Sequence, residues 1–173
     1  MLEVDNDYTK RPSKENYYLN MAKATSMRGT CLRRNYGAVI VKDDRIISTG
    51  YTGAPVGIEN CCDKGSCLRQ QLNIPSGHNY ELCHSVHAEM NAILKANPID
   101  LKDSILYLYG YEVETNHPVQ LATPCLLCTK MILNANIKCV IRHKYNPDHS
   151  VFDVDYMSKD DLINLYNSNI RSI

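Results

Sequence analysis

The order of strand-like and helix-like segments constrains the fold more than any other feature of this sequence. Two β-rich segments, residues 36–42 and 45–51, are separated only by Asp43-Asp44, a spacing that predicts a hairpin. After the hairpin, segments with helix and strand patterns alternate along the chain. This alternation predicts a mixed sheet with helices on both faces. We therefore expect an α/β fold, built as a three-layer α/β/α sandwich.

Capping residues and apolar patterns place the individual elements. Helices are expected at residues 14–28, 87–96, 125–134 and 158–169, and further strands at 104–110 and 138–142. Ser13 and Ser158 are suitable N-caps, and Asn97-Pro98 ends the second helix. A length of 173 residues is typical of one domain. We expect a single domain over residues 1–173, interrupted by a Cys-, Gly- and Pro-rich insertion loop at about residues 52–83.

Composition excludes several classes of protein. The chain has 19 basic and 19 acidic residues, and this zero net charge argues against non-specific binding of nucleic acid. No apolar run is long enough to cross a membrane, and the N-terminal segment lacks the pattern of a signal peptide. We expect a cytoplasmic protein without a membrane role. In a reducing compartment, eight closely spaced cysteines indicate metal ligands or catalytic groups rather than disulfides.

Two motifs carry the chemistry, His87-Ala-Glu89 and Pro124-Cys125-Leu-Leu-Cys128. A Cys-x-x-Cys at the start of a helix directs both sulfurs to one point, and the positive helix end favours the thiolates that bind metal. His87, at the start of another helix, can supply a third ligand. One nitrogen and two sulfurs suit Zn²⁺ with a fourth position left for water.

Glu89 completes this constellation, because its spacing from His87 places a carboxylate beside the metal without ligating it. A carboxylate there can accept a proton from water and return it to a substrate nitrogen. The full pattern, H-x-E followed by P-C-x-x-C, is typical of zinc-dependent nucleobase deaminases. A redox pair or half of a structural zinc site would also contain Cys-x-x-Cys. The segment before Cys125 is a poor strand for a redox fold, and Cys139 has no partner cysteine for a zinc knuckle.

Over roughly residues 14–148 the sequence resembles the cytidine deaminase superfamily, and within it the deoxycytidylate (dCMP) deaminases. The segments that carry the resemblance begin at Cys31, Ile47, Cys83, Thr123 and Ala135, and contain both chemical motifs. The Gly-Tyr-Thr-Gly-Ala-Pro segment at 50–55, followed by a Cys-rich insertion, resembles the dCMP branch. The resemblance implies a sheet of roughly five strands.

The resemblance also implies an activity, the conversion of dCMP and water to dUMP and ammonia, which supplies dUMP for dTMP synthesis. His87, Cys125 and Cys128 would bind the catalytic zinc, and Glu89 would protonate pyrimidine N3 and then the departing amine. Some members carry a second, structural zinc, for which five residues are candidates: Cys31, Cys61, Cys67, Cys83 and His84. Members commonly form hexamers and respond to dCTP and dTTP, with Mg²⁺ accompanying the effector.

The remaining assignments concern substrate or effector contacts. Thr52 and Gly53 match the family's nucleotide-binding loop, where Thr52 replaces the usual Asn, and Tyr145 corresponds to a Tyr near the phosphate. Arg33 and Arg34 are assigned no role. His117, His143 and His149 lie in polar loops or at strand ends, so we expect them to be exposed.

Three alternatives stay open at this point. The enzyme could be bifunctional, deaminating dCTP as well as dCMP. It could be a tRNA or nucleic-acid editing deaminase, which shares the zinc motif but needs a basic groove. It could also be a non-enzymatic zinc module, which would need neither Glu89 nor an open coordination position.

Overall fold

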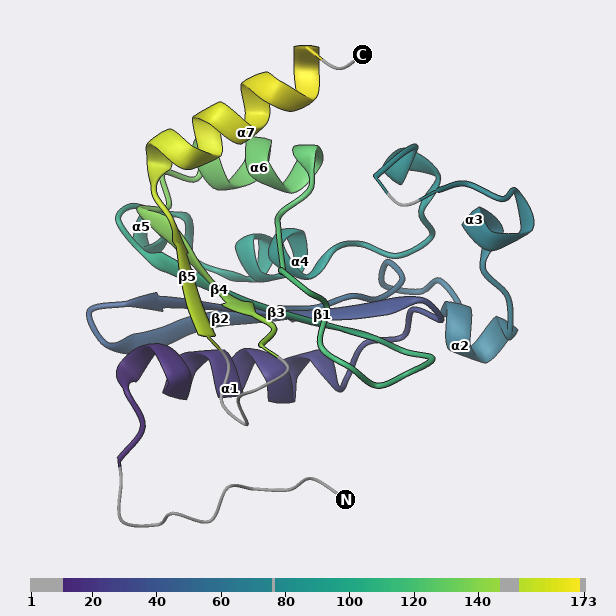
Figure 1. Ribbon diagram of the computed structural model, residues 1–173, viewed down its shortest axis with the longest axis horizontal. Coiled ribbons are helices and arrows are strands. Elements are labelled where there is room, and N and C mark those ends of the chain that lie inside the picture. Colours follow the sequence, from purple (N-terminus) through teal and green to yellow (C-terminus); the bar gives the residue numbers. More distant parts are fainter. Residues whose placement is uncertain (1–10, 76, 147–152, 172–173) are drawn as a thin grey trace.

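The computed structural model describes residues 11–75, 77–146 and 153–171. Its core is a five-stranded sheet with helices on both faces, and five strands, seven α-helices and one 3-10 helix are assigned in those residues (Figure 1). The helices are α1 (Lys14–Ser26), α2 (Cys61–Lys64), α3 (Leu68–Gln71), the 3-10 helix η1 (Tyr80–Leu82), α4 (Ala88–Lys95), α5 (Pro98–Leu101), α6 (Leu126–Asn134) and α7 (Lys159–Arg171). The strands are β1 (Arg34–Lys42), β2 (Arg45–Tyr51), β3 (Ile105–Glu112), β4 (Cys139–Lys144) and β5 (Asp153–Met157).

The strands are ordered β2-β1-β3-β4-β5. Only the β3–β4 pair is parallel, and the other three pairs are antiparallel. The parallel pair requires a crossover, which α6 provides between the two strands. The sheet is therefore mixed, as the alternation of segments predicts.

Two apolar clusters hold the layers together. On one face, α1 packs its buried Tyr18, Leu19 and Ala22 against Val39 and Tyr107 of the sheet. On the opposite face, α4, α6 and α7 cover a larger cluster that is centred on β1, β3 and β4. Figure 1 shows α1 alone below the sheet and the other long helices above it. The expected three-layer α/β/α sandwich is confirmed.

Helix α4 rests on β2 through backbone contact. A Cβ atom at Gly50 would lie only 2.3 Å from the carbonyl oxygen of Ala88 and from the nitrogen of Ala92. The hydroxyl of Ser48 donates to the carbonyl oxygen of Ala92 at 2.5 Å, which joins the same two elements. Because glycine has no side chain, the helix can approach the strand this closely. The position of the α4 N-terminus is thus fixed by β2.

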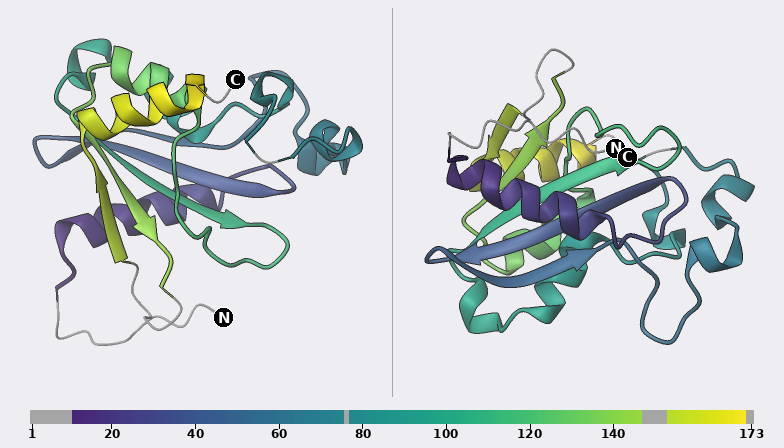
Figure 2. Two further views of the ribbon diagram at one scale, coloured as in Figure 1. Left: turned by 45° about the horizontal axis from the view of Figure 1, so that its top comes forward. Right: turned by 90° about the horizontal axis from the view of Figure 1, so that it is seen from below.

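Residues 52–83, here called the insertion, form a loop with the short helices α2, α3 and η1. They stand at one end of the sheet, beside the start of α4 (Figures 1 and 2). From residue 54 onward, the buried side chains among those described are Cys61, Cys67 and Arg69. The insertion therefore adds little to the apolar core.

Local signals predict the helix starts and the hairpin well. The Ser13 hydroxyl accepts a hydrogen bond from the Asn16 N–H at 3.1 Å, and Asp43 and Asp44 both have positive φ, as a two-residue hairpin turn needs. Strand β5 was not expected from the pattern, because Asp153-Val-Asp-Tyr-Met157 is too polar. As an edge strand paired only with β4, it needs no apolar run.

The histidine expectations need a correction. His143 is fully buried, with Nε2 2.8 Å from the carbonyl oxygen of Val119 and its ring 4.5 Å from that of Tyr109. It lies in β4, an inner strand, so the sheet and the covering segments bury it. His117 is exposed as expected, and His149 lies outside the described residues.

Candidate active site and metal centre

The two sequence motifs meet because two helices begin at the same point. His87 is the N-cap residue of α4 and Cys125 is the N-cap residue of α6, with Cys128 in the first turn of α6. Pro124 precedes Cys125, and proline suits a helix start because it costs no intrahelical N–H bond there. Both helix N-termini carry a partial positive charge, which favours thiolates at this point.

These three residues form a compact cluster. His87 Nδ1 lies 3.3 Å from Cys125 Sγ and 3.4 Å from Cys128 Sγ. Within the described part of the chain, this is the one group of three His, Cys, Asp or Glu residues whose ligand atoms all lie within 4.8 Å of one another. Tetrahedral zinc, with bonds of about 2.0–2.3 Å, separates its ligand atoms by about 3.5–3.8 Å. The spacing of the cluster thus suits a tetrahedral metal ion.

The electrostatics of the cluster favour a bound cation. The pKa of the Cys125 thiol is lowered to about 4, first because Cys128 donates a hydrogen bond to the Cys125 thiolate and then because His87 also stabilises it. The Cys125 thiolate and burial together raise the pKa of Cys128. At neutral pH the cluster therefore already holds a thiolate, the form of cysteine that binds metal.

Glu89 lies one residue into α4, beside the cluster, and its side chain is buried. Burial raises the pKa of its carboxyl, and the charge of His87 opposes that effect. A buried carboxyl with a raised pKa takes up and holds a proton more readily than an exposed one, and can pass it to a neighbouring group. Glu89 thus has the properties of a general acid and base.

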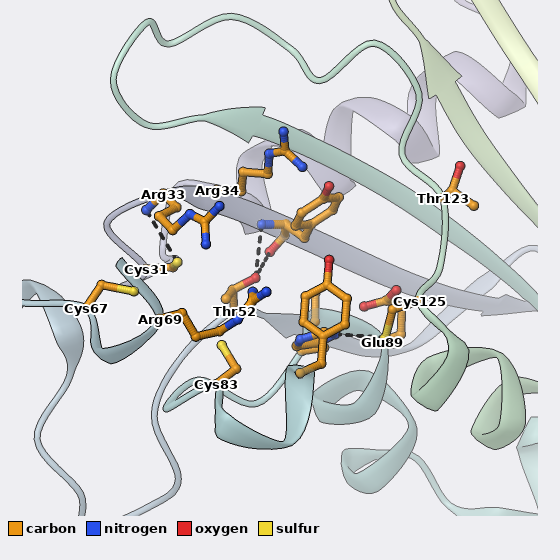
Figure 3. A pocket seen from close by; sticks show the side chains of 14 residues that line it. Cys31, Arg33, Arg34, Thr52, Cys67, Arg69, Cys83, Glu89, Thr123 and Cys125 are labelled. Carbon is orange, nitrogen blue, oxygen red and sulfur yellow. Dashed lines mark hydrogen bonds between the residues drawn. The ribbon is translucent and has the colours of Figure 1, made fainter. Parts of the chain in front are cut away.

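The cluster and Glu89 lie at a pocket of about 710 Å³, measured with its open mouth. Residues of β1, the insertion and the starts of α4 and α6 line it (Figure 3). Three arginines, Arg33, Arg34 and Arg69, share this lining with one carboxylate, that of Glu89. The charge of this lining favours an anionic ligand.

The insertion contributes the wall that touches His87. The ring of Tyr80 meets the His87 ring edge-on, with 5.1 Å between centroids, and the Arg69 guanidinium lies 4.5 Å from the Tyr80 centroid. A hydrogen bond also joins the Cys83 sulfur to His87. Burial acts to raise the pKa of the Cys83 thiol, but the hydrogen bond and the charge of His87 contribute to a net lowering. Tertiary contacts of the insertion therefore help to fix the orientation of the His87 ring.

The candidates for a second metal site lie on this side of the pocket. Cys31, Cys67 and Cys83 line the pocket. Burial raises the pKa of the nearby Cys61 thiol, and the charges of these three cysteines raise it further. Among the described residues, no three of these cysteines have sulfur atoms that all lie within 4.8 Å of one another. His84 lies apart from the lining residues, with Nε2 2.7 Å from the carbonyl oxygen of Glu59.

The three residues expected at a substrate or effector contact lie in different places. Thr52 lines the pocket, but its hydroxyl accepts a hydrogen bond from the Tyr36 N–H of β1 at 3.0 Å. Gly53 forms a two-bond bridge with Val86, so it positions the segment just before His87. Tyr145 lies outside the residues that line the pocket.

Sequence reasoning assigned no role to Arg69 or Tyr80. Both lie in the insertion, where the pattern has no helical or strand period that could indicate which side chains face inward. An Arg and a Tyr within a Cys-, Gly- and Pro-rich loop were the available signal. Only the tertiary structure brings them to His87.

Comparison with known proteins agrees with this geometry. Residues 12–144 match the family model described as "Cytidine and deoxycytidylate deaminase zinc-binding region". The deoxycytidylate deaminase of Schizosaccharomyces pombe is 35% identical over 140 residues, 80% of this chain and 39% of that protein. The deoxycytidylate deaminase of Mycobacterium phage D29 is 34% identical over 139 residues, 78% of this chain and 97% of that protein. The chain thus spans less than half of the yeast protein and nearly the whole of the phage protein.

A solved structure shares the fold. The crystal structure of dCMP deaminase from the cyanophage S-TIM5 in apo form superposes with a TM-score of 0.55 at 24% identity, covering 92% of this chain and 94% of that chain. At this identity the likeness establishes the fold of the sheet and its helices. Among the described helices, none has the length and hydrophobicity that crossing a bilayer requires.

Proposed function

The chain belongs to the cytidine and deoxycytidylate deaminase zinc-binding family, and on that premise we propose that it converts dCMP and water to dUMP and ammonia. One observation carries the proposal. A His-Cys-Cys cluster and a buried Glu meet in a pocket whose other charged lining residues are arginines. The product dUMP would then serve dTMP synthesis.

Zinc fits the residues that are present. The donor set of one imidazole nitrogen and two sulfurs is that of a zinc site with an open fourth position, and the ligand atoms already have a suitable spacing. When bound, zinc lowers the pKa of a coordinated water and so supplies the nucleophile at neutral pH. His87, Cys125 and Cys128 would hold the ion.

Glu89 would perform the proton transfers. Its buried carboxyl, with a raised pKa, would accept one proton from water and deliver it to pyrimidine N3. It would then accept the second proton, from the hydroxyl group added at C4, and deliver it to the departing amine, which leaves as ammonia. The burial that raises its pKa also limits the contact of this carboxyl with bulk water. The proposal therefore assigns binding of zinc and transfer of protons to different residues.

The decisive experiment combines an assay with metal analysis. We expect purified protein with zinc to release ammonia from dCMP, and Glu89→Gln to retain zinc while activity falls on the order of 10³-fold. Cys125→Ser serves as the matched variant, because it should lose both zinc and activity. Full activity in Glu89→Gln would contradict the mechanism. An inactive wild-type protein that holds one zinc would favour a non-enzymatic zinc module.

Substrate competition distinguishes the enzymatic alternatives. Turnover of dCTP at a rate similar to dCMP would indicate a bifunctional enzyme. Salt-dependent RNA binding together with deamination of tRNA would indicate an editing enzyme, although the net charge of zero is unfavourable for that class.

A second zinc is part of the proposal, held by Cys31, Cys61, Cys67 and Cys83. The support is their common placement around the insertion, with all four sulfurs in free cysteines. Zinc would then stabilise a loop that has little apolar core. Two zinc ions per chain in the wild type and one in Cys61→Ser would support this; one per chain in both would refute it.

The remaining expectations are also proposals. Residues 1–173 would form one deaminase domain, and hexamers that respond to dCTP and dTTP with Mg²⁺ would be detected by sedimentation and by assays with each effector. A cytoplasmic location suits the eight free cysteines, which persist in reducing compartments.

A further inference from the structure

The start of α6 is held in place from outside the helix. Cys125 is the N-cap residue, but its side chain makes no capping hydrogen bond and stays available for a metal ion. The geometry of a metal site depends on how firmly the residues behind its ligands are held. For His87, the Gly53–Val86 bridge supplies such a contact. The corresponding contact for Cys125 has to come from the segment that precedes it.

That segment runs along the end of β4. Leu121 forms a β-bridge with Lys144, and the N–H of Ala122 donates to the carbonyl oxygen of His143 at 3.4 Å. Across the described residues, the backbone hydrogen bonds of this segment end at Ala122. From Thr123 onward, a side-chain contact connects the segment to the sheet.

Arg142 of β4 makes this contact. Its Nη1 donates to Thr123 Oγ1 at 2.6 Å, and its Nε donates to Asp155 Oδ2, also at 2.6 Å. The Arg142 side chain is only 12% exposed, and Asp155 is its register partner on β5. Two short hydrogen bonds in different directions restrict the planar guanidinium to one orientation. Thr123 is therefore bound by a rigid donor.

The link from Thr123 to Cys125 is short and stiff. Only Pro124 lies between them, and its side chain is buried. Proline fixes its own φ angle and restricts the residue before it to extended conformations. Holding the Thr123 side chain thus also holds the backbone of Cys125. In Figure 3, Thr123 lies on the segment that leads to Cys125, and its hydroxyl oxygen is directed away from Cys125 and Glu89.

We propose that Arg142 is a positioning residue for the metal ligand Cys125, and that it acts through the Thr123 hydroxyl. The inference rests on the zinc site of the proposed function. Arg142 is not among the residues that line the pocket, so it acts on the site from behind. The strand β4 then fixes the cysteine side of the metal site, as β2 fixes the histidine side through α4.

The test measures the metal site directly. Zinc affinity is determined by competition with a chelator, and Co²⁺ in place of zinc gives visible absorption bands that depend on the geometry of the sulfur ligands. Thr123→Val removes the hydroxyl but keeps the branched shape, whereas Thr123→Ser keeps the hydroxyl. Thr25→Val is the matched control, because the Thr25 hydroxyl also makes a hydrogen bond, to the Met21 carbonyl oxygen at 2.8 Å, but in α1 on the opposite face of the sheet.

We expect Thr123→Val to weaken zinc binding by about 10-fold and to shift the Co²⁺ bands. Thr123→Ser and Thr25→Val should match the wild type in both measurements. Arg142→Met should weaken zinc binding at least as much as Thr123→Val. Adding Thr123→Val to Arg142→Met should cause no further loss, because the two substitutions remove the same contact.

Unchanged zinc affinity and Co²⁺ bands in Thr123→Val would overturn the proposal, and so would losses that add in the double variant. A rise in KM for dCMP without any change in metal binding would instead indicate that Thr123 contacts the substrate, which also overturns it. Failure of the proposed function would differ, because zinc-loaded wild type would deaminate no dCMP while its Co²⁺ bands still depended on Thr123. A wild type that binds neither ion would overturn both.

Discussion

Replacing Gly50 by alanine should reduce the activity of the site, because the added methyl group would displace α4. The added methyl would lie 2.3 Å from the Ala88 oxygen and the Ala92 nitrogen, whereas ordinary contact begins at 3.4 Å. Helix and strand must therefore separate by about 1 Å. Because His87 and Glu89 lie at the first turn of that helix, they move with it.

Two magnitudes follow from this displacement. Overpacking of this kind costs about 1–3 kcal/mol of unfolding free energy, and each kcal/mol lowers Tm by about 2–4 °C in a chain of this size. A displacement of about 1 Å at a catalytic group reduces the rate by about 10²-fold. We expect Gly50→Ala to fold with a lower Tm and to lose about two orders of magnitude in kcat/KM for dCMP.

Gly37→Ala is the matched control. Its methyl would lie 2.1 Å from the carbonyl oxygen of Ala22, so the strain is similar, but it acts on α1 on the opposite face of the sheet. Thermal unfolding and steady-state assays of both variants separate stability from activity. If Gly50→Ala lost no more activity than Gly37→Ala at equal loss of Tm, the contact between α4 and β2 would not position the site.

Two further predictions concern electrostatics. Asp155→Ala removes the partner that binds Arg142 Nε at 2.6 Å, and since that arginine side chain is only 12% exposed, urea unfolding should show a loss of about 1–2 kcal/mol. Lys14→Ala, in the exposed pair with Asp44, should change the unfolding free energy less; an equal loss in both variants would contradict the burial argument. Asp161→Asn should lower stability at pH 7, with the difference from wild type shrinking as the pH falls below 3.8. Hydrogen bonds from the Ser158 hydroxyl and N–H lower the pKa of Asp161, so its contribution is present above the unfolded-state pKa and is lost as the pH falls through the folded-state pKa. A difference that is independent of pH would refute it.

The parts of this structure that local chemistry determines could be predicted from the sequence. Ser13 and Ser158 begin helices because their hydroxyls satisfy helix N–H groups, and Asp43-Asp44 forms the hairpin turn. His87 and Cys125 also begin helices, although neither side chain caps its helix. The motif pair predicts that they share one metal site.

What escaped prediction depends on contacts between distant segments. Strand β5 has no apolar pattern and exists because β4 offers it a free edge. His143 is buried by a sheet position that no local pattern indicates. Arg69 and Tyr80 reach the site only because the insertion folds over the start of α4, and irregular loops have no period from which an inward face could be read.

The sparse burial of the insertion has a consequence for how the molecule opens. A segment with so few buried apolar side chains has a small free energy of local unfolding, so it can detach while β1 and β3 keep their full protection. In protein without the proposed second zinc, backbone amides at 59–64 and 68–73 should then exchange with solvent far faster than those of β3. Mild denaturant should withdraw Arg69 and Tyr80 from the pocket at concentrations that leave the sheet folded, because the insertion and the sheet belong to different cooperative units.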